Sequence, residues 1–186
     1  MTSEDRNRAE IEDELLAIRC QLGEPLAFDE LVARWHAPLW RYLRRLAAAD
    51  DVAAETLQEV WLRVVRGISR LREPARLRAW LFGIARRAAM DRLRQQYAAP
   101  PLVEAELADL PAGEEIADAG EDVTVLLREL DLLPVVEREA LTLFYLRELS
   151  LAEIAGVLAI PVGTVKSRLF RARRLLREQI QSKENP

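Results

Sequence analysis

The sequence has little of what metal and redox chemistry needs. Its 186 residues include one cysteine, Cys20, and one histidine, His36, so an intrachain disulfide and a His/Cys metal cluster are both excluded. Only seven glycines are present, and none belongs to a glycine-rich loop that could cradle phosphate groups. We therefore expect a protein that is not an enzyme and that needs no cofactor and no metal ion. A single cysteine also fits a reducing compartment.

Long apolar runs are lacking as well. No segment reaches the roughly 18 consecutive apolar residues of a membrane-spanning helix. The first residues, MTSEDRNRAEIEDELL, have neither the cationic start nor the apolar core of a secretion signal. The sequence therefore predicts a cytoplasmic protein without membrane insertion.

Charge of either sign is abundant, but it is arranged in blocks. The whole chain carries a net charge of −4, made of −6 over residues 1–30, +8 over 31–97, −10 over 98–139 and +4 over 140–186. Two basic blocks separated by an acidic one indicate two modules that face nucleic acid, with a connector that does not lie on phosphate.

Helical periodicity is nearly continuous along the chain, and strand alternation is absent. This pattern predicts an all-α protein with two small helical domains joined by a flexible acidic linker, the second domain containing a helix-turn-helix. The predicted segments are an acidic N-terminal extension with one amphipathic helix (1–24), a first domain (25–97), the linker (98–122) and the second domain (123–186).

Apolar residues at helical spacing indicate which faces are buried. In the N-terminal extension they form a stripe on an otherwise charged helix, although the sequence does not indicate the partner of that stripe. Tryptophans on apolar faces are expected in the core rather than stacked on DNA. The stripe consists of Ile11, Leu15, Ile18 and Leu22, and the tryptophans are Trp35, Trp61 and Trp80.

The segment 150–177 has the pattern of a helix-turn-helix. Ser150 stands three residues before Glu153 and just ahead of an apolar run, which is the spacing of a capping box, so a helix should begin at Leu151. Pro161 is compatible only with the first turn of a helix, so a second helix should begin near Pro161 or Val162.

The second helix of this motif is strongly basic. Between Pro161 and Arg177 there are six cationic residues and no acidic residue, a density suited to neutralising phosphates and reading base edges. The alternative is a solvated basic helix that merely closes a bundle. The cations are Lys166, Arg168, Arg171, Arg173, Arg174 and Arg177.

Several segments of the sequence together resemble one protein family. FDELVARWHAPLWRYLRRL, AAETLQEVWLRVV and RAWLFGIARRAAMDRLR are similar to the first conserved domain of the extracytoplasmic-function (ECF) sigma factors, a branch of the bacterial sigma-70 family. LLPVVEREALTLFYLRELSLAEIAGVLAIPVGTVKSRLFRARRLL is similar to the second. The resemblance implies a subunit that binds core RNA polymerase, directs it to promoters, helps to open the duplex and acts in a stress or envelope response. An anti-sigma factor is the partner that usually controls such proteins.

The resemblance also implies where the contacts lie. For the upstream (minus-35) element, the second helix should enter the major groove, with base-edge candidates and phosphate candidates along it. For the downstream (minus-10) element, the loop 69–76 and the next helix should bind single-stranded DNA in a cationic groove. The polymerase-binding residues implied are Glu55, Gln58, Glu59 and Arg63. The upstream candidates are Thr164, Lys166, Ser167, Phe170 and Arg171, with Arg168, Arg173, Arg174 and Arg177 for phosphates. The downstream candidates are Arg70, Arg72, Arg76, Arg78, Arg86, Arg87 and Arg92.

Two further expectations depend on the family pattern. Ala159 stands where glycine is common, so a residue with a Cβ must adopt whatever backbone geometry the turn needs. The acidic linker resembles a placeholder that occupies a basic channel of the polymerase until nucleic acid fills it. The alternative is a tether whose charge only keeps it extended and soluble.

A competing function is an autonomous helix-turn-helix regulator that binds its operator as a dimer. That hypothesis explains residues 133–177 but leaves the basic, tryptophan-containing first module unexplained, and no heptad run supplies a dimer interface. A nucleic-acid enzyme is disfavoured because the basic modules contain no carboxylate cluster with metal-binding spacing.

Overall fold

The computed structural model describes residues 3–47, 49–97 and 121–184, and every regular element in these ranges is helical. No strand occurs in this part of the chain, so the all-α prediction is confirmed. The predicted linker lies outside the described residues as far as residue 120; its last two residues belong to α5. Nor does any described helix combine the length and the low polarity needed to cross a bilayer.

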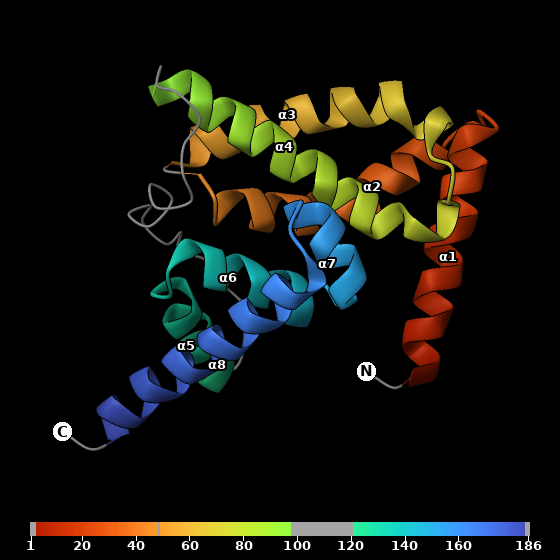
Figure 1. The fold of residues 1–186 in the computed structure, drawn as a ribbon. Coiled ribbons are helices and arrows are strands. Elements are labelled where there is room, and N and C mark those ends of the chain that lie inside the picture. The colour runs from red at the N-terminus through yellow and green to blue at the C-terminus, as the bar shows by residue number, and fades with distance from the viewer. Residues whose placement is uncertain (1–2, 48, 98–120, 185–186) are drawn as a thin grey trace.

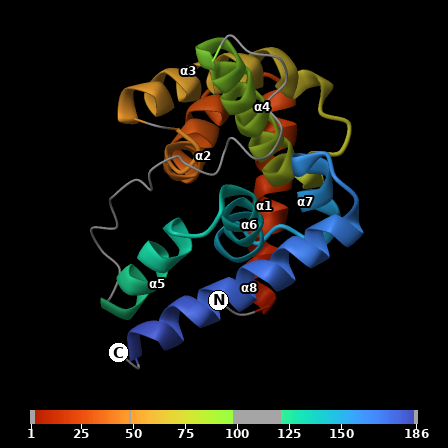
Figure 2. The same ribbon diagram turned by 60° about the vertical axis from the view of Figure 1, so that its left-hand side comes forward.

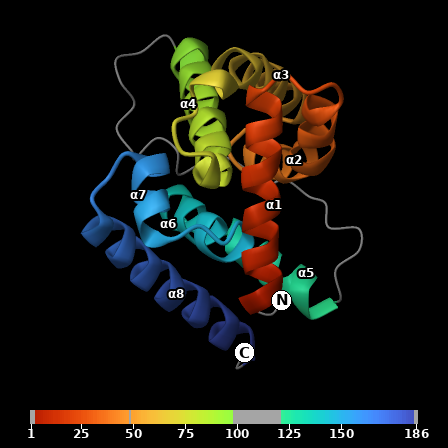
Figure 3. The same ribbon diagram turned by 90° about the vertical axis from the view of Figure 1, so that its right-hand side faces the viewer.

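The first group of helices comprises α1 (Ser3–Gln21), α2 (Ala27–Arg44), α3 (Asp50–Gly67) and α4 (Leu77–Tyr97), with the short 3-10 turns η1 (Ile68–Arg70) and η2 (Pro74–Arg76) between α3 and α4. The helices α2, α3 and α4 pack together, and α1 lies across them (Figures 1 and 3). Their facing side chains form an apolar core, most of which lies on the faces indicated by helical spacing, although Phe82 was not among the expected residues. It includes Leu31, Leu39, Leu43, Val60, Val64, Leu81 and Phe82.

The tryptophans belong to this core, as the sequence predicted. Trp35 is buried and meets Phe82 edge-on, with ring centroids 6.1 Å apart. Trp61 and Trp80 are partly buried against the same core. Trp80 lies so close to Gly67 that a Cβ on this glycine would be 3.1 Å from the indole ring, so glycine permits the close contact of α3 with α4.

Helix α1 forms as predicted, but its apolar stripe is not the face it buries. Ile11, Leu15 and Leu22 are exposed, and the helix packs instead through Leu16 and a buried aspartate, Asp13. The carboxylate of Asp13 pairs with two guanidinium groups of the first group, which offsets part of the cost of burying its charge. Its partners are Arg34 at 2.8 Å and Arg78 at 3.1 Å.

The second group comprises α5 (Glu121–Asp131), α6 (Val135–Leu141), a π-helical turn, η4 (Thr142–Leu146), α7 (Leu151–Leu158) and α8 (Val162–Glu184). The helices α7 and α8 are the predicted helix-turn-helix. The capping box is confirmed, because the Ser150 backbone N–H donates to Glu153 Oε2 at 2.8 Å and the Glu153 N–H donates to Ser150 Oγ at 3.3 Å. Ala159 ends α7 with φ at +55°, a left-handed conformation that glycine would adopt with less strain.

The two groups pack against each other in the described structure. Helix α7 contacts α4, and α8 runs below them past α6 (Figures 1 and 2). Helix α6 is unusual because three successive charged residues in it are buried, namely Glu137, Arg138 and Glu139. Buried charges need partners, and the partners of both glutamates come from other helices.

Candidate functional site

The outward face of α8 is the clearest candidate for a DNA-binding surface. Val165, Leu169 and Ala172 are buried, and they fix the helix against the rest of the second group. The residues on the opposite side are exposed and combine cations, a hydroxyl and an aromatic ring. They are Lys166, Ser167, Phe170 and Arg174. Phe170 is 69% exposed, so its ring is available for apolar contact with a base edge.

Two predicted upstream arginines are oriented by neighbouring side chains. Arg171 Nη1 lies 3.0 Å from Glu137 Oε1, and this carboxylate is 3% exposed. Arg173 Nε donates to the hydroxyl of Tyr145 at 2.9 Å, and its guanidinium lies 5.7 Å and 5.5 Å from the ring centroids of Phe144 and Tyr145. Both arginines remain exposed, so each is held in place without being removed from solvent.

Two other predicted upstream residues are less accessible. Arg168 is 6% exposed and belongs to the buried side of α8. The expectation that it contacts phosphate does not fit this burial, since helical spacing places it beside Val165 and Leu169 rather than on the outward face. Thr164 is half-buried, and its carbonyl accepts a hydrogen bond from the Ser167 hydroxyl at 2.9 Å.

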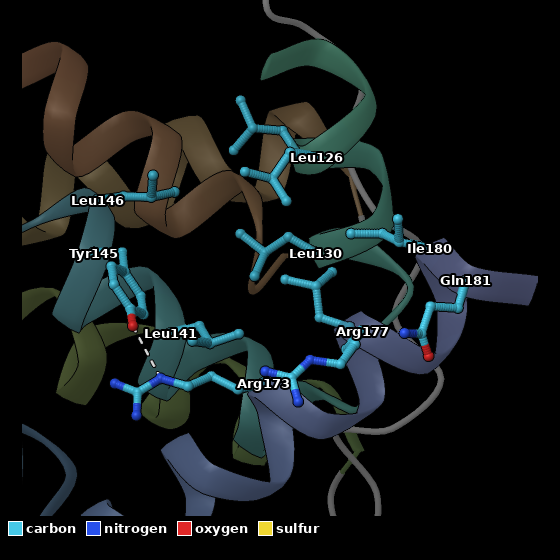
Figure 4. A pocket seen from close by; sticks show the side chains of 11 residues that line it. Leu126, Leu130, Leu141, Tyr145, Leu146, Arg173, Arg177, Ile180 and Gln181 are labelled. Carbon is cyan, nitrogen blue, oxygen red and sulfur yellow. Dashed lines mark hydrogen bonds between the residues drawn. The ribbon is translucent and has the colours of Figure 1, made fainter. Parts of the chain in front are cut away.

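An apolar groove of about 490 Å³ runs along the C-terminal half of α8 (Figure 4). Leucines of α5 and Ile180 of α8 form its walls, and the two predicted phosphate contacts Arg173 and Arg177 stand at its edge. Arg174, the other predicted phosphate contact in this part of α8, does not line the groove.

Four of the predicted downstream residues are exposed, with Arg70, Arg72 and Arg76 before α4 and Arg87 in the middle of α4. Three of them, all but Arg70, line a hollow of about 270 Å³ that is closed on its other side by Glu153 and Gly156 of α7. Three of the downstream candidates therefore share one hollow with α7, the first helix of the helix-turn-helix.

Arg76 pairs with Glu73 in solvent, and the other downstream candidates, Arg78, Arg86 and Arg92, are also paired with carboxylates. The side chain of Arg78 is 16% exposed and pairs with Asp13. The side chain of Arg86 is 18% exposed, and its Nε lies 3.2 Å from Glu139 Oε1. Arg92 pairs with Glu55 and so lies with the predicted polymerase-binding residues rather than with the loop.

The four predicted polymerase-binding residues are brought together by the fold. Glu55, Gln58, Glu59 and Arg63 line a polar hollow of about 380 Å³ between α3 and α4. Arg63 lies 2.9 Å from both Glu59 and Asp91. The hydrogen bond with Glu59 contributes most to raising the pKa of Arg63 above its usual value. This surface therefore presents ordered carboxylates, an amide and one arginine to a polar partner.

Sequence reasoning missed the buried acidic residues that hold the arginines. Asp13, Glu137 and Glu139 were counted only as members of acidic blocks, although each neutralises a cation of another helix. The short run of charges inside VVEREAL was the available signal, because a helix with apolar residues on both sides of such a run is expected to bury part of it. The described residues contain no group of His, Cys, Asp and Glu that could hold a metal ion.

Two family models match the chain in the order of its two groups. The sigma-70 region 2 model matches residues 31–98, and the sigma-70 region 4 model matches residues 124–176. The ECF RNA polymerase sigma-E factor of Escherichia coli (strain K12) is 31% identical over 184 residues, which cover 92% of this chain and 96% of that protein. The ECF RNA polymerase sigma factor SigM of Mycobacterium tuberculosis is 36% identical over 161 residues, covering 86% of this chain and 80% of SigM.

Two solved structures share the fold. CnrH, in complex with the cytosolic domain of CnrY, has a TM-score of 0.61 and 25% identity, covering 91% of this chain and 97% of CnrH. The sigma factor RpoE of Bartonella quintana, in complex with the anti-sigma factor NepR, has a TM-score of 0.67 and 21% identity, covering 84% of this chain and 98% of RpoE.

Sigma factors are transcription initiation factors without enzymatic activity, so the expectation that this chain is not an enzyme is confirmed. Three findings point to the same family. The two family models match in the expected order, the helix-turn-helix lies at the predicted position, and the similarity covers most of the chain. The chain belongs to the family of ECF RNA polymerase sigma factors.

Proposed function

We propose that the chain binds core RNA polymerase, directs it to specific promoters and promotes melting of the duplex, in a stress or envelope response in the cytoplasm. The observation that carries this proposal is the outward face of α8, where Lys166, Ser167, Phe170 and Arg174 are exposed on the second helix of a capped helix-turn-helix. Such a helix can enter the major groove of the upstream element with its N-terminal half near the bases.

The upstream element is read by residues of two kinds. Lys166, Ser167, Phe170 and Arg171 contact base edges, and Arg171 is presented in a fixed direction because Glu137 holds its guanidinium at 3.0 Å. Arg174 positions a phosphate, as do Arg173 and Arg177 if their side chains leave the edge of the apolar groove.

The downstream element binds at the loop and along the first half of α4. Arg70, Arg72, Arg76 and Arg87 supply exposed positive charge there, and the hollow beside them offers a place for an extruded base. Arg78 and Arg86 join this surface only when their carboxylate partners release them.

Polymerase binding uses the polar hollow between α3 and α4. Glu55, Gln58, Glu59 and Arg63 lie together there, on a surface that the second group leaves open. We also propose an anti-sigma factor as a second partner, since the sigma factor RpoE of similar fold was solved in complex with one.

Co-purification with core polymerase distinguishes this function from the competing one. A sigma factor should bind core at near one-to-one stoichiometry, whereas an autonomous dimeric regulator should bind its operator and leave core unbound. Retention of the full chain on immobilised core, followed by quantification of both components, supplies the comparison.

Reversing charge at the polymerase face tests its placement. Glu55→Lys with Glu59→Lys should weaken core capture strongly, because two carboxylates of the hollow become repulsive toward a basic partner. Glu10→Lys with Glu14→Lys is the matched control, since this pair on α1 has the same spacing in a helix. Equal capture by both double variants, with unchanged helix content, would show that polymerase binds elsewhere.

A further inference from the structure

Glu137 and Arg171 form an ion pair whose two members differ in their exposure to solvent. The side chain of Glu137 in α6 is 3% exposed and that of Arg171 in α8 is 58% exposed, with Arg171 Nη1 3.0 Å from Glu137 Oε1. At this exposure Arg171 can be hydrated without any carboxylate. Burying a carboxylate is costly, and an apolar side chain of similar volume is often at least as stable in its place. Stability alone therefore does not account for a carboxylate at position 137.

The carboxylate of Glu137 lies on a firmly packed part of the second group. Helix α6 packs against α8. Buried Val135 and Leu141 hold α6, and buried Leu169 holds α8. The Glu137 N–H donates to the carbonyl of Pro134 at 3.1 Å in the first turn of α6. The backbone is thus fixed on both sides of the ion pair, so the carboxylate is a stationary partner for Arg171.

The ion pair restricts the guanidinium of Arg171 and still leaves donors free. A guanidinium group is planar and carries five N–H donors in a rigid arrangement. A charge-assisted hydrogen bond to one nitrogen limits the positions that the plane can take. The remaining donors can make the bidentate contact with O6 and N7 of a guanine. Because Arg171 is already ordered by Glu137, it loses less conformational freedom when it binds that base.

The same carboxylate reduces the attraction of this part of α8 to phosphate. The formal charges of Glu137 and Arg171 cancel, and a guanidinium held by a buried oxygen is less able to turn toward the DNA backbone. Contacts with phosphate carry no sequence information, and they supply essentially all of non-specific binding. The ion pair should therefore weaken binding to DNA in general and favour a sequence that presents guanine to Arg171.

We propose that Glu137 is a positioning residue for promoter recognition, which holds Arg171 for a guanine of the upstream element and lowers the affinity for other sequences. The proposal rests on the proposed function, in which α8 enters the major groove. Glu137 itself does not contact DNA, because its side chain is 3% exposed. It determines specificity through the arginine that it orients.

Glu137→Met tests this role, since it removes the ion pair and keeps a side chain of similar length in the buried position. The full chain bound to core is titrated with duplexes in which each base pair of the upstream element is changed in turn. Discrimination at the position affected by Arg171→Ala should fall about fivefold, within the range of a bidentate base contact. Binding to a random duplex should become about threefold tighter and more dependent on salt. A purely structural role predicts weaker binding to all sequences, and that result would refute the proposal.

A double-mutant cycle shows whether Glu137 acts through Arg171. Adding Glu137→Met to Arg171→Ala should cause no further loss of discrimination, because the side chain that Glu137 positions is then absent. A further loss of about fivefold would mean that the two residues act independently, contrary to the proposal.

Glu137→Gln is the conservative variant. Its amide oxygen can still accept a hydrogen bond from Arg171, but without the charge the bond is weaker, so discrimination should lie between those of the unmodified chain and Glu137→Met. If Glu137→Met loses helix content, Glu137→Gln decides. Discrimination equal to that of the unmodified chain would then overturn the positioning role.

The matched control is Glu178→Met. Glu178 pairs with Arg174 at 3.6 Å, and the side chains of both residues are more than half exposed. This variant removes the same unit of charge beside α8, so binding to the random duplex should tighten to a similar extent. Discrimination within the upstream element should not change, because a solvated pair holds its arginine only weakly. An equal loss of discrimination in both variants would reduce the effect to net charge and contradict the role of Glu137.

Arg171→Ala alone distinguishes failure of this inference from failure of the proposed function. If Arg171→Ala lowers discrimination at one position and Glu137→Met does not, only the positioning role of Glu137 is wrong. If Arg171→Ala alters discrimination at no position, the base contact assigned to Arg171 is wrong, and the role of Glu137 falls with it.

Discussion

The α8 surface and the α4 surface are both rich in arginine, yet the fold treats their charges differently. On α8, Lys166 and Arg174 point away from the protein, and even the paired Arg171 remains exposed. On α4, Arg78 and Arg86 are paired with carboxylates that are almost fully buried. The number of cations along a helix therefore gives its charge. The helices packed against it decide which of these cations can reach DNA.

The difference has a simple structural origin. Helix α8 is packed on one side only, so its far side is left to solvent. Helix α4 contacts α1, α2 and α3 in the first group and α7 in the second, so an arginine on most of its faces meets a neighbour. Burying a guanidinium is costly unless a carboxylate compensates it, and Asp13 and Glu139 supply that compensation.

The largest expected effect separates two arginines of the same helix. Arg168→Ala should lower the free energy of unfolding by about 3 kcal/mol, because it removes a long side chain that is 6% exposed. Arg174→Ala should change it by less than about 0.5 kcal/mol, since its ion pair with Glu178 at 3.6 Å lies in solvent. Urea denaturation measures the free energy of unfolding of both variants, provided that their m-values are unchanged. Similar losses for the two variants would remove the distinction between the buried and outward sides of α8.

A smaller effect is expected for base reading. Arg171→Ala should cost about 1–3 kcal/mol of binding to the preferred upstream sequence and relax discrimination at one position. Arg174→Ala should instead weaken binding equally on all sequences and reduce its salt dependence, as expected for a phosphate contact. The two variants are compared by titrating each full chain, bound to core, with a panel of upstream sequences. A uniform loss for Arg171→Ala would reassign this residue to phosphate.

The smallest effect concerns Phe170. Because its ring is 69% exposed, Phe170→Ala should leave the free energy of unfolding nearly unchanged. It should cost about 1 kcal/mol of discrimination at one base pair, consistent with apolar contact to a thymine methyl group. Replacing that thymine by uracil removes the methyl group and should abolish the difference between the two proteins. A difference that persists with uracil would exclude the methyl contact.

Much of the fold could be predicted from the sequence, because helical spacing and local signals determine it. The capping box at Ser150, the turn at Ala159 and the tryptophan-containing core all depend on residues close together in the chain or on one apolar face. The buried face of α1 was not predictable in this way. It includes Asp13, whose long-range pairs with Arg34 and Arg78 are not revealed by local apolar spacing.

The same distinction between local signals and long-range contacts applies to the candidate sites. Glu55, Gln58, Glu59 and Arg63, which we propose as polymerase contacts, line one hollow because they follow one another on a single helix. Accessibility of the arginines on α4 was not predictable, since the carboxylate that pairs with Arg86 is 53 residues away in sequence. Charge counted by segment placed Glu139 in an acidic block, whereas the fold places it against a basic helix.

Run-off transcription with purified core polymerase on a library of promoters tests the central claim most directly. The chain should direct core to a subset of promoters that share an upstream and a downstream element, and the α8 variants should change the choice of upstream element. Transcripts no more abundant than with core alone on every promoter, from a chain of full helix content, would contradict the assignment of promoter recognition to these two surfaces.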